Sequence, residues 1–138
     1  MTRPMYESQR DRDNEQRVID LMKERRGLIL RKMPISYRLD FMIMKDHEVL
    51  GFAELKCRNV PSTAYDTLLI SLGKVAAANL LWRTSELSCY LIALFTDRCG
   101  VIDFRAPHKL GLGGRVDRGD PADVEPVAHY PMSRFTWL

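Results

Sequence analysis

The sequence has few of the residues that build disulfide or zinc frameworks. It contains three cysteines, an odd number with no CxxC pair, and three histidines that lie far apart and next to no cysteine. A disulfide framework and a cysteine-based zinc site are therefore not expected. Unpaired cysteines favour a reducing compartment, so we expect a cytoplasmic protein.

Long apolar runs, internal repeats and low-complexity tracts are also missing from the sequence. Without a run long enough to span a bilayer, we expect no membrane partner. The N-terminus MTRPMYESQRDRDNEQR is polar and charged, unlike a secretory signal. The 138 residues, of which 46% are hydrophobic, predict a single domain over residues 1–138 with a core of its own.

Several common enzyme motifs are not present. The stretch GLGG at 111–114 has neither the Lys-Ser/Thr of a P-loop nor a complete GxGxxG. No Ser/His/Asp or Cys/His triad can be argued from the sequence. We therefore predict neither a P-loop nucleotide site nor nucleophilic catalysis by a triad.

The charge is mildly positive. The net charge is +3 and the pI about 8.9, and the excess lies in residues 1–58, with 13 Lys and Arg against 10 Asp and Glu. This balance is compatible with a nucleic-acid partner but does not require one. The cluster Arg25, Arg26, Arg31 and Lys32 is either a solvated basic face or a phosphate-contacting one.

The hydrophobic pattern predicts two helices and several strands. In chain order we expect a helix at 8–26, a short strand within 28–34, a hairpin of strands 37–44 and 49–57, a loop at 59–66, a helix at 67–83, a buried strand at 88–96, a short strand at 101–104, an exposed Gly/Pro-rich loop at 106–125, and an edge strand or docking tail at 126–138. This order predicts an α/β or α+β sheet layered with helices.

Two carboxylates fall in the predicted hairpin, whose strands are otherwise apolar. Glu54 and Lys56 share one strand face, because side chains alternate across a strand. If the hairpin loop is residues 46–48, Asp40 lies directly opposite Glu54, at a Cβ separation of about 4.5–5.5 Å. Two carboxylates at this range repel each other, so the pattern requires a compensating charge.

A magnesium ion resolves the repulsion, because it prefers carboxylate, water and phosphate oxygens. Asp40 and Glu54 supply the carboxylates, and the backbone carbonyl of Leu55 is a further candidate ligand. Lys56 points the same way and can orient or deprotonate an attacking water, or meet the charge that develops on a phosphate. Glu15 lies on the core-facing stripe of the first helix, where it can accept the metal or a metal-bound water.

A simpler explanation of the pattern remains open. Acidic and basic residues commonly alternate on a solvated strand face, so Lys56 can form a surface ion pair with one carboxylate. Against this, Glu54-Leu55-Lys56 is the only Asp/Glu-x-Lys in the sequence, and it lies in an apolar hairpin.

The order of these features resembles the PD-(D/E)XK nuclease superfamily over residues 10–104. The resemblance implies an α/β, restriction-endonuclease-like fold with a mixed β-sheet core flanked by helices. One family residue differs, since Leu39 stands where the family has proline before the aspartate. The residues that carry the resemblance are Glu15 on a helix, Asp40 on a strand, and Glu54-Leu55-Lys56 on the next strand.

The resemblance also implies an activity, magnesium-dependent hydrolysis of phosphodiester bonds in DNA, with manganese as a substitute. By this resemblance Asp40 and Glu54 bind magnesium, Lys56 assists the water and Glu15 joins the site. In several branches of the superfamily a polar or basic residue of the second helix reaches the scissile phosphate, which makes Lys74 a candidate. Its long side chain can equally extend along apolar surface toward solvent.

Two rival functions are compatible with the same residues. The first is a Holliday junction resolvase acting as a homodimer, which requires a two-fold dimer. The second is a non-catalytic nucleic-acid-binding module on the same fold. Small size and a basic front half also resemble phage-encoded nucleases, which act in the host cell cytoplasm.

Overall fold

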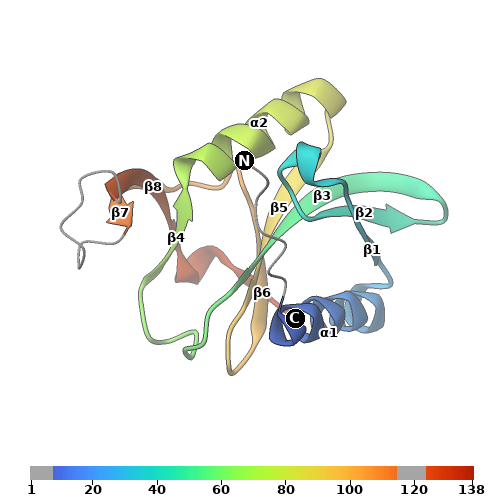
Figure 1. Cartoon of the computed structure of the whole chain (residues 1–138), viewed down its shortest axis with the longest axis horizontal. Coiled ribbons are helices and arrows are strands. Elements are labelled where there is room, and N and C mark those ends of the chain that lie inside the picture. The colour runs from blue at the N-terminus through green and yellow to red at the C-terminus, as the bar shows by residue number, and fades with distance from the viewer. Residues whose placement is uncertain (1–7, 115–123) are drawn as a thin grey trace.

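In the computed structural model, which describes residues 8–114 and 124–138, helices and strands are arranged in layers (Figure 1). The elements are, in chain order, α1 (Gln9–Arg26), β1 (Ile29–Lys32), the 3-10 helix η1 (Ile35–Tyr37), β2 (Phe41–Lys45), β3 (Glu48–Cys57), β4 (Thr67–Ser71), α2 (Leu72–Ser85), β5 (Ser88–Leu94), β6 (Cys99–Asp103), β7 (Lys109–Gly114), β8 (Val124–Pro131), the 3-10 helix η3 (Met132–Arg134) and β9 (Thr136–Trp137).

The strands of the described residues form two sheets. The larger has the order β1-β2-β3-β5-β6-β9, and the smaller has the order β4-β8-β7. In the larger sheet β3 and β5 are parallel and the other neighbours are antiparallel. This mixed sheet flanked by helices is the predicted fold class, which is confirmed.

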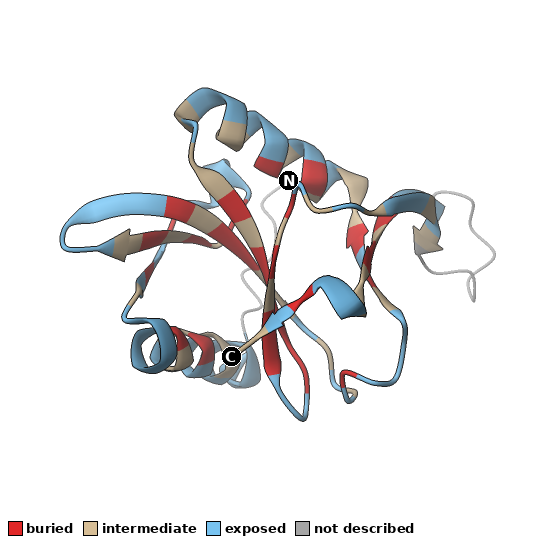
Figure 2. Cartoon of the chain, turned by 180° about the vertical axis from the view of Figure 1, so that it is seen from behind, coloured by how far each residue is buried: buried red, intermediate tan, exposed pale blue. Residues whose placement is uncertain are grey.

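The larger sheet is covered on both faces. Phe41 and Ala53 belong to the core cluster that includes α1, whereas their neighbours Met42 and Phe52 pack against the cluster that includes α2 and the smaller sheet. This is the alternation expected of a strand buried on both sides. The central strands are accordingly the most buried part of the chain, and the outer faces of the helices are exposed (Figure 2).

Helix α1 begins and ends where the sequence predicts. The Ser8 side chain accepts a hydrogen bond from the Asp11 N–H, and the Asp11 carboxylate accepts one from the Ser8 N–H, a capping box. Gly27 ends the helix with a φ of 65°, a left-handed conformation that glycine adopts without strain. Among the described residues, no helix is both long enough and apolar enough to cross a membrane.

The β2–β3 hairpin has a tighter turn than predicted but the predicted register near Asp40. Asp46 and His47 form the turn, both with positive φ, and Lys45 pairs with Glu48. A register shift between Ile43 and Met44 then moves the pairing by one residue, so that Phe41 pairs with Ala53. A bulge of this kind restores the alignment that the predicted three-residue loop would have given.

The prediction for residues 67–83 is wrong at its start. The first five of these residues form β4, which pairs with β8, and the helix begins only after Ser71, whose side chain accepts a hydrogen bond from the Gly73 N–H at 3.3 Å. Within the helix, Val75 is buried and Leu80 is 66% exposed. A short apolar run suits a strand or a helix, and its pairing partner lies far along the chain.

The predicted exposed loop at 106–125 is wrong at both described ends. Residues 109–114 form β7, and residues 124 and 125 open β8, the strand between β4 and β7. The stretch 115–123 lies outside the described residues. The predicted terminal strand divides into β8 and the short β9, which is an edge strand of the larger sheet.

Glycines in β7 make room for side chains of β8. A Cβ added to Gly111 would lie 2.6 Å from His129 Nε2, and one added to Gly113 would lie 2.8 Å from a methyl carbon of Val127. Glycine weakens most strands, which is why the composition indicates a loop. Here the missing side chains allow His129 and Val127 to lie across the neighbouring strand.

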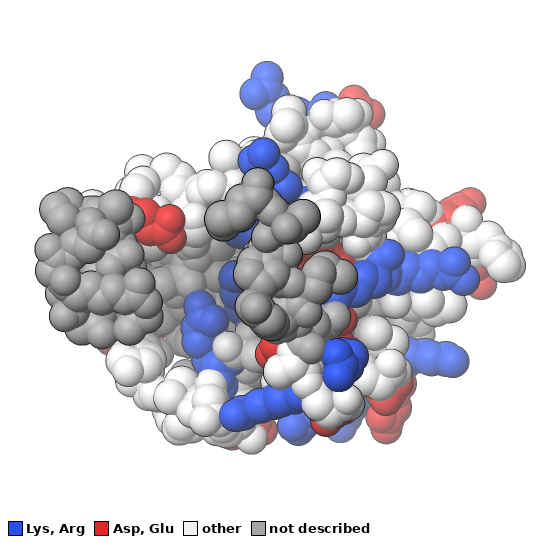
Figure 3. Space-filling model, in the orientation of Figure 1, with Lys and Arg blue, Asp and Glu red and all other residues white. Residues whose placement is uncertain are grey.

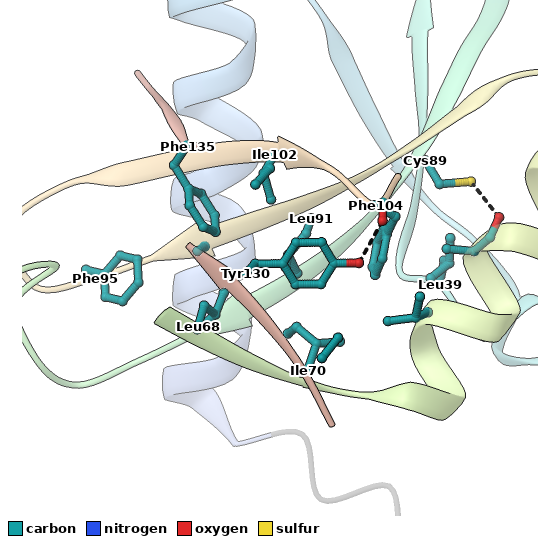
Figure 4. Close-up of a cluster of buried hydrophobic side chains, with 14 of the residues drawn as sticks. Leu39, Leu68, Ile70, Cys89, Leu91, Phe95, Ile102, Phe104, Tyr130 and Phe135 are labelled. Atoms are coloured by element: carbon teal, nitrogen blue, oxygen red, sulfur yellow. Dashed lines mark hydrogen bonds between the residues drawn. The ribbon is translucent and has the colours of Figure 1, made fainter. Parts of the chain in front are cut away.

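Tyr130 joins the two sheets. Its hydroxyl donates a 2.7 Å hydrogen bond to the carbonyl of Phe104, and its ring packs edge-on against the Phe104 ring in the buried cluster (Figure 4). The side chain is fully buried. If its hydroxyl were removed, the carbonyl of Phe104 would lose its hydrogen-bond partner, and water could not take that place.

We expect Tyr130→Phe to lower the free energy of unfolding by about 1–3 kcal/mol, because it leaves a buried acceptor unpaired. Urea denaturation followed by circular dichroism measures the change. Tyr37→Phe is the matched control, since Tyr37 is exposed on η1 and its variant should unfold like the wild type. Equal midpoints for both variants would contradict the assigned role.

Candidate active site

Asp40 lies one residue before β2 and is fixed by two hydrogen bonds. Its backbone carbonyl accepts one from the Met33 N–H at 2.8 Å, and its carboxylate Oδ2 accepts one from the Leu55 N–H at 2.7 Å. The pairing of Phe41 with Ala53, continued by one residue, sets Asp40 beside Glu54. The carboxylate is thus held before any ligand arrives.

Glu54 is a buried carboxylate in the middle of β3, with 3% of its surface exposed. Burial, and after it the neighbouring Asp40 charge, raise its pKa from 4.5 to about 7, against the opposing effect of Lys74 and Lys56. Its Oε2 atom has no hydrogen-bond partner among the described residues. An unsatisfied buried carboxylate oxygen is costly for stability, which is typical of a functional site.

Lys56 lies two residues after Glu54 on β3 and therefore on the same face. It is half-buried, and its charge acts on the Glu54 carboxyl group. No hydrogen bond or ion pair within the described part of the chain engages its amine. The amine is therefore available to a water molecule or a phosphate beside the carboxylates.

Lys74 reaches the same carboxylate from the first turn of α2. Its Nζ lies 3.1 Å from Glu54 Oε2, close enough for an ion pair although the geometry is not that of a hydrogen bond. The amine also donates a hydrogen bond to the carbonyl of Arg38, the residue that ends η1. The structure thus places Lys74 at the predicted site, while its catalytic role stays a prediction.

Glu15 is not brought to this carboxylate pair. It is partly buried on α1, as predicted, but its ion-pair partner in the described residues is Lys32 of β1. Helix α1 covers the face of the sheet that carries Phe41, whereas Glu54 points to the α2 face. The predicted fourth member of the site therefore lies on the opposite face.

Cys57 is the last residue of β3. Its thiol lies within electrostatic range of Asp40 and also of Glu15. The residue is exposed.

The donor set of the site fits a divalent cation. In an extended strand the N–H and C=O of one residue point to the same side, so the Leu55 carbonyl is directed toward Asp40. Two carboxylates and one backbone oxygen are typical magnesium ligands, and a cation between Asp40 and Glu54 would offset the repulsion between their charges. Among the described residues, no group of three or more His, Cys, Asp and Glu side chains converges.

The sequence gives no signal for the contacts that fix the site. The Leu55 N–H, which holds Asp40, and the Arg38 carbonyl, which holds Lys74, are both backbone groups. Arg58, by contrast, donates to the carbonyls of Cys57 and Leu69, which favours a structural role. Backbone partners depend on tertiary packing and cannot be read from residue types.

The basic cluster predicted near the first helix does not form one surface. Arg25 and Arg26 occupy the last turn of α1, where positive charge is favourable to the helix dipole. Arg31 and Lys32 are adjacent in β1 and so point to opposite faces, with Lys32 paired to Glu15. These contacts favour the explanation as solvated and paired side chains.

The comparison with known protein families agrees with this geometry. No curated protein matches the sequence. A family described as "Phage putative PDDEXK endonuclease" matches residues 1–138, which confirms the resemblance to the PD-(D/E)XK nucleases and the restriction-endonuclease-like fold. The chain therefore belongs to this phage family of PD-(D/E)XK endonucleases.

Proposed function

We propose that the protein is a magnesium-dependent endonuclease that hydrolyses phosphodiester bonds in DNA. The observation that carries this proposal is the buried Glu54 carboxylate, which lies beside Asp40 and on the same strand face as Lys56. Manganese is expected to replace magnesium, since both accept oxygen ligands.

Each residue of the site has a proposed task. Asp40 and Glu54 hold the cation together with the Leu55 carbonyl, and the Leu55 N–H keeps the Asp40 carboxylate in place. When bound, magnesium lowers the pKa of water and neutralises phosphate charge. Lys56 orients or deprotonates the attacking water, or meets the negative charge that develops on the phosphate. The water attacks phosphorus in line with the leaving oxygen.

The charge on the molecular surface is compatible with a nucleic-acid substrate. Lys and Arg side chains are visible around the middle of the face seen in Figure 3, with carboxylates between them. The net charge of +3 favours approach of a polyanion without steering it strongly. Ile35 and Tyr37, large and exposed on η1, offer apolar contacts close to Asp40.

We expect Asp40→Asn to abolish magnesium-dependent cleavage, because it removes one of two carboxylate ligands while retaining an acceptor for the Leu55 N–H. The measurement is a cleavage panel over single strands, duplexes, nicks, flaps and four-way junctions, with and without magnesium. Asp46→Asn is the matched control, because this aspartate lies in the turn of the same hairpin, and asparagine tolerates its positive φ.

The panel separates the rival functions. Symmetric cuts confined to four-way junctions, together with a dimer in solution, would favour a resolvase instead. A purified wild-type protein that binds DNA but cleaves nothing with either metal would favour a binding module. Cleavage retained by Asp40→Asn would contradict the assigned site.

A further inference from the structure

We propose that Lys74 takes the place of a second cation, so that the site holds a single divalent ion. This inference rests on the proposed nuclease function and adds the number of ions and the residue that fixes it. It is carried by the position of Lys74 Nζ, 3.1 Å from Glu54 Oε2.

The amine of Lys74 lies where a second ion would share the Glu54 carboxylate. In two-metal sites the ions are about 3.5–4 Å apart and contact common ligands. Here a protein cation already occupies one side of that carboxylate, and the Leu55 N–H already occupies Asp40 Oδ2. The oxygens left for a metal are the second carboxylate oxygen of Asp40 and the second carboxylate oxygen of Glu54.

The Lys74 amine is also held from the backbone side. It donates a hydrogen bond to the Arg38 carbonyl, and Arg38 ends the turn two residues before Asp40. Its stem belongs to the first turn of α2, which Ser71 caps. A cation fixed by a helix, a carbonyl and a carboxylate is pre-organised, and 27% exposure of its side chain leaves one side open to substrate.

The charges of the site balance with one divalent ion. The carboxylates of Asp40 and Glu54 are formally cancelled by the amines of Lys56 and Lys74, and the charges of Asp40, Lys56 and Lys74 all act on Glu54. Attack on a phosphodiester creates a doubly negative transition state, which one divalent ion neutralises. A second ion would leave excess positive charge, with no third acidic ligand converging in the described part of the chain.

The test is the stoichiometry of manganese binding to the full chain, measured by titration calorimetry and by electron paramagnetic resonance without DNA. We expect one ion per wild-type chain with the spectrum of an isolated ion. Lys74→Glu should bind a second ion magnetically coupled to the first. Lys45→Glu, the same change at the exposed end of β2, should still bind one.

A second variant keeps the inference testable if Lys74→Glu does not fold. Lys74→Gln removes the competing charge without adding a ligand. It should bind the single ion about tenfold more tightly than the wild type when both are measured at a pH at which Glu54 is ionised. Two coupled ions in the wild type, or unchanged binding in every folded Lys74 variant, would overturn the inference and leave the nuclease function standing. Absence of any manganese binding to the wild type would overturn both.

Discussion

Replacing Lys56 with alanine is expected to slow cleavage by about 10²–10⁴-fold, the usual contribution of a positioned proton-transfer or charge-stabilising group. The amine shares a strand face with Glu54 and has no ion-pair or hydrogen-bond partner in the described residues. Removing it therefore takes away a group that acts on the substrate and leaves no protein group unsatisfied.

Single-turnover cleavage at saturating magnesium isolates the chemical step for this variant. The fold, followed by circular dichroism, should remain near wild type, and one manganese ion, followed by calorimetry, should still bind, because the metal ligands are intact. Lys45→Ala is the control, since Lys45 ends β2 at the far end of the same hairpin. A Lys56→Ala enzyme with wild-type turnover would remove Lys56 from the mechanism.

The carboxylate pair was predictable from the sequence because strand geometry is regular. Alternation places Glu54 and Lys56 on one face whatever surrounds them. The position of Asp40 depends on register, and here the predicted loop was wrong while the pairing was right. The two-residue turn at Asp46 and His47 moves the strand pairing by one residue, and the register shift between Ile43 and Met44 moves it back. The residue types alone do not predict this compensation.

The start of the second helix could not be predicted from the sequence. Thr67–Ser71 is apolar at several positions and continues smoothly into the helix, so a helical period fits it. What makes this run a strand is β8, some sixty residues later in the chain, which pairs with it from Thr67–Pro131 to Ser71–Val127. Lys74 was nevertheless predicted at the site, because it lies within the second helix for either start and the family resemblance points to a basic residue there.

Glu15 illustrates a different limit. Its spacing from Val18 and Met22 places it toward the sheet, and the structure agrees. The sequence does not say which face of the sheet a helix will cover, because both faces of these strands are apolar. Helix α1 covers the face opposite Glu54, so the inward carboxylate meets Lys32 instead.

Replacing Glu54 with glutamine is expected to separate stability from function. The pKa of Glu54 is raised from 4.5 in an unfolded chain to about 7 in the fold, first by burial and then by Asp40. The folded state therefore binds this proton more tightly than the unfolded state. The stability linked to it is fully present below pH 4.5 and is lost as the pH rises through about 7.

The size of the effect follows from the difference between the two pKa values. It corresponds to about 3 kcal/mol of unfolding free energy above pH 7, as an order of magnitude. Because glutamine is neutral at every pH, Glu54→Gln should be more stable than the wild type by up to this amount above pH 7. The difference should shrink toward zero as the pH falls to 4.5.

Urea unfolding of the metal-free proteins across this pH range measures the difference. Glu48→Gln is the matched control, because Glu48 is the exposed first residue of the same strand, and its variant should follow the wild-type curve. Glu54→Gln should also lose manganese binding and cleavage, since the lost charge is a proposed metal ligand. A stability difference that does not change with pH, or a variant less stable than the wild type above pH 7, would contradict the assignment of this titration to Glu54. In that case the burial of the Glu54 carboxylate would need an explanation other than the cation that it is proposed to bind.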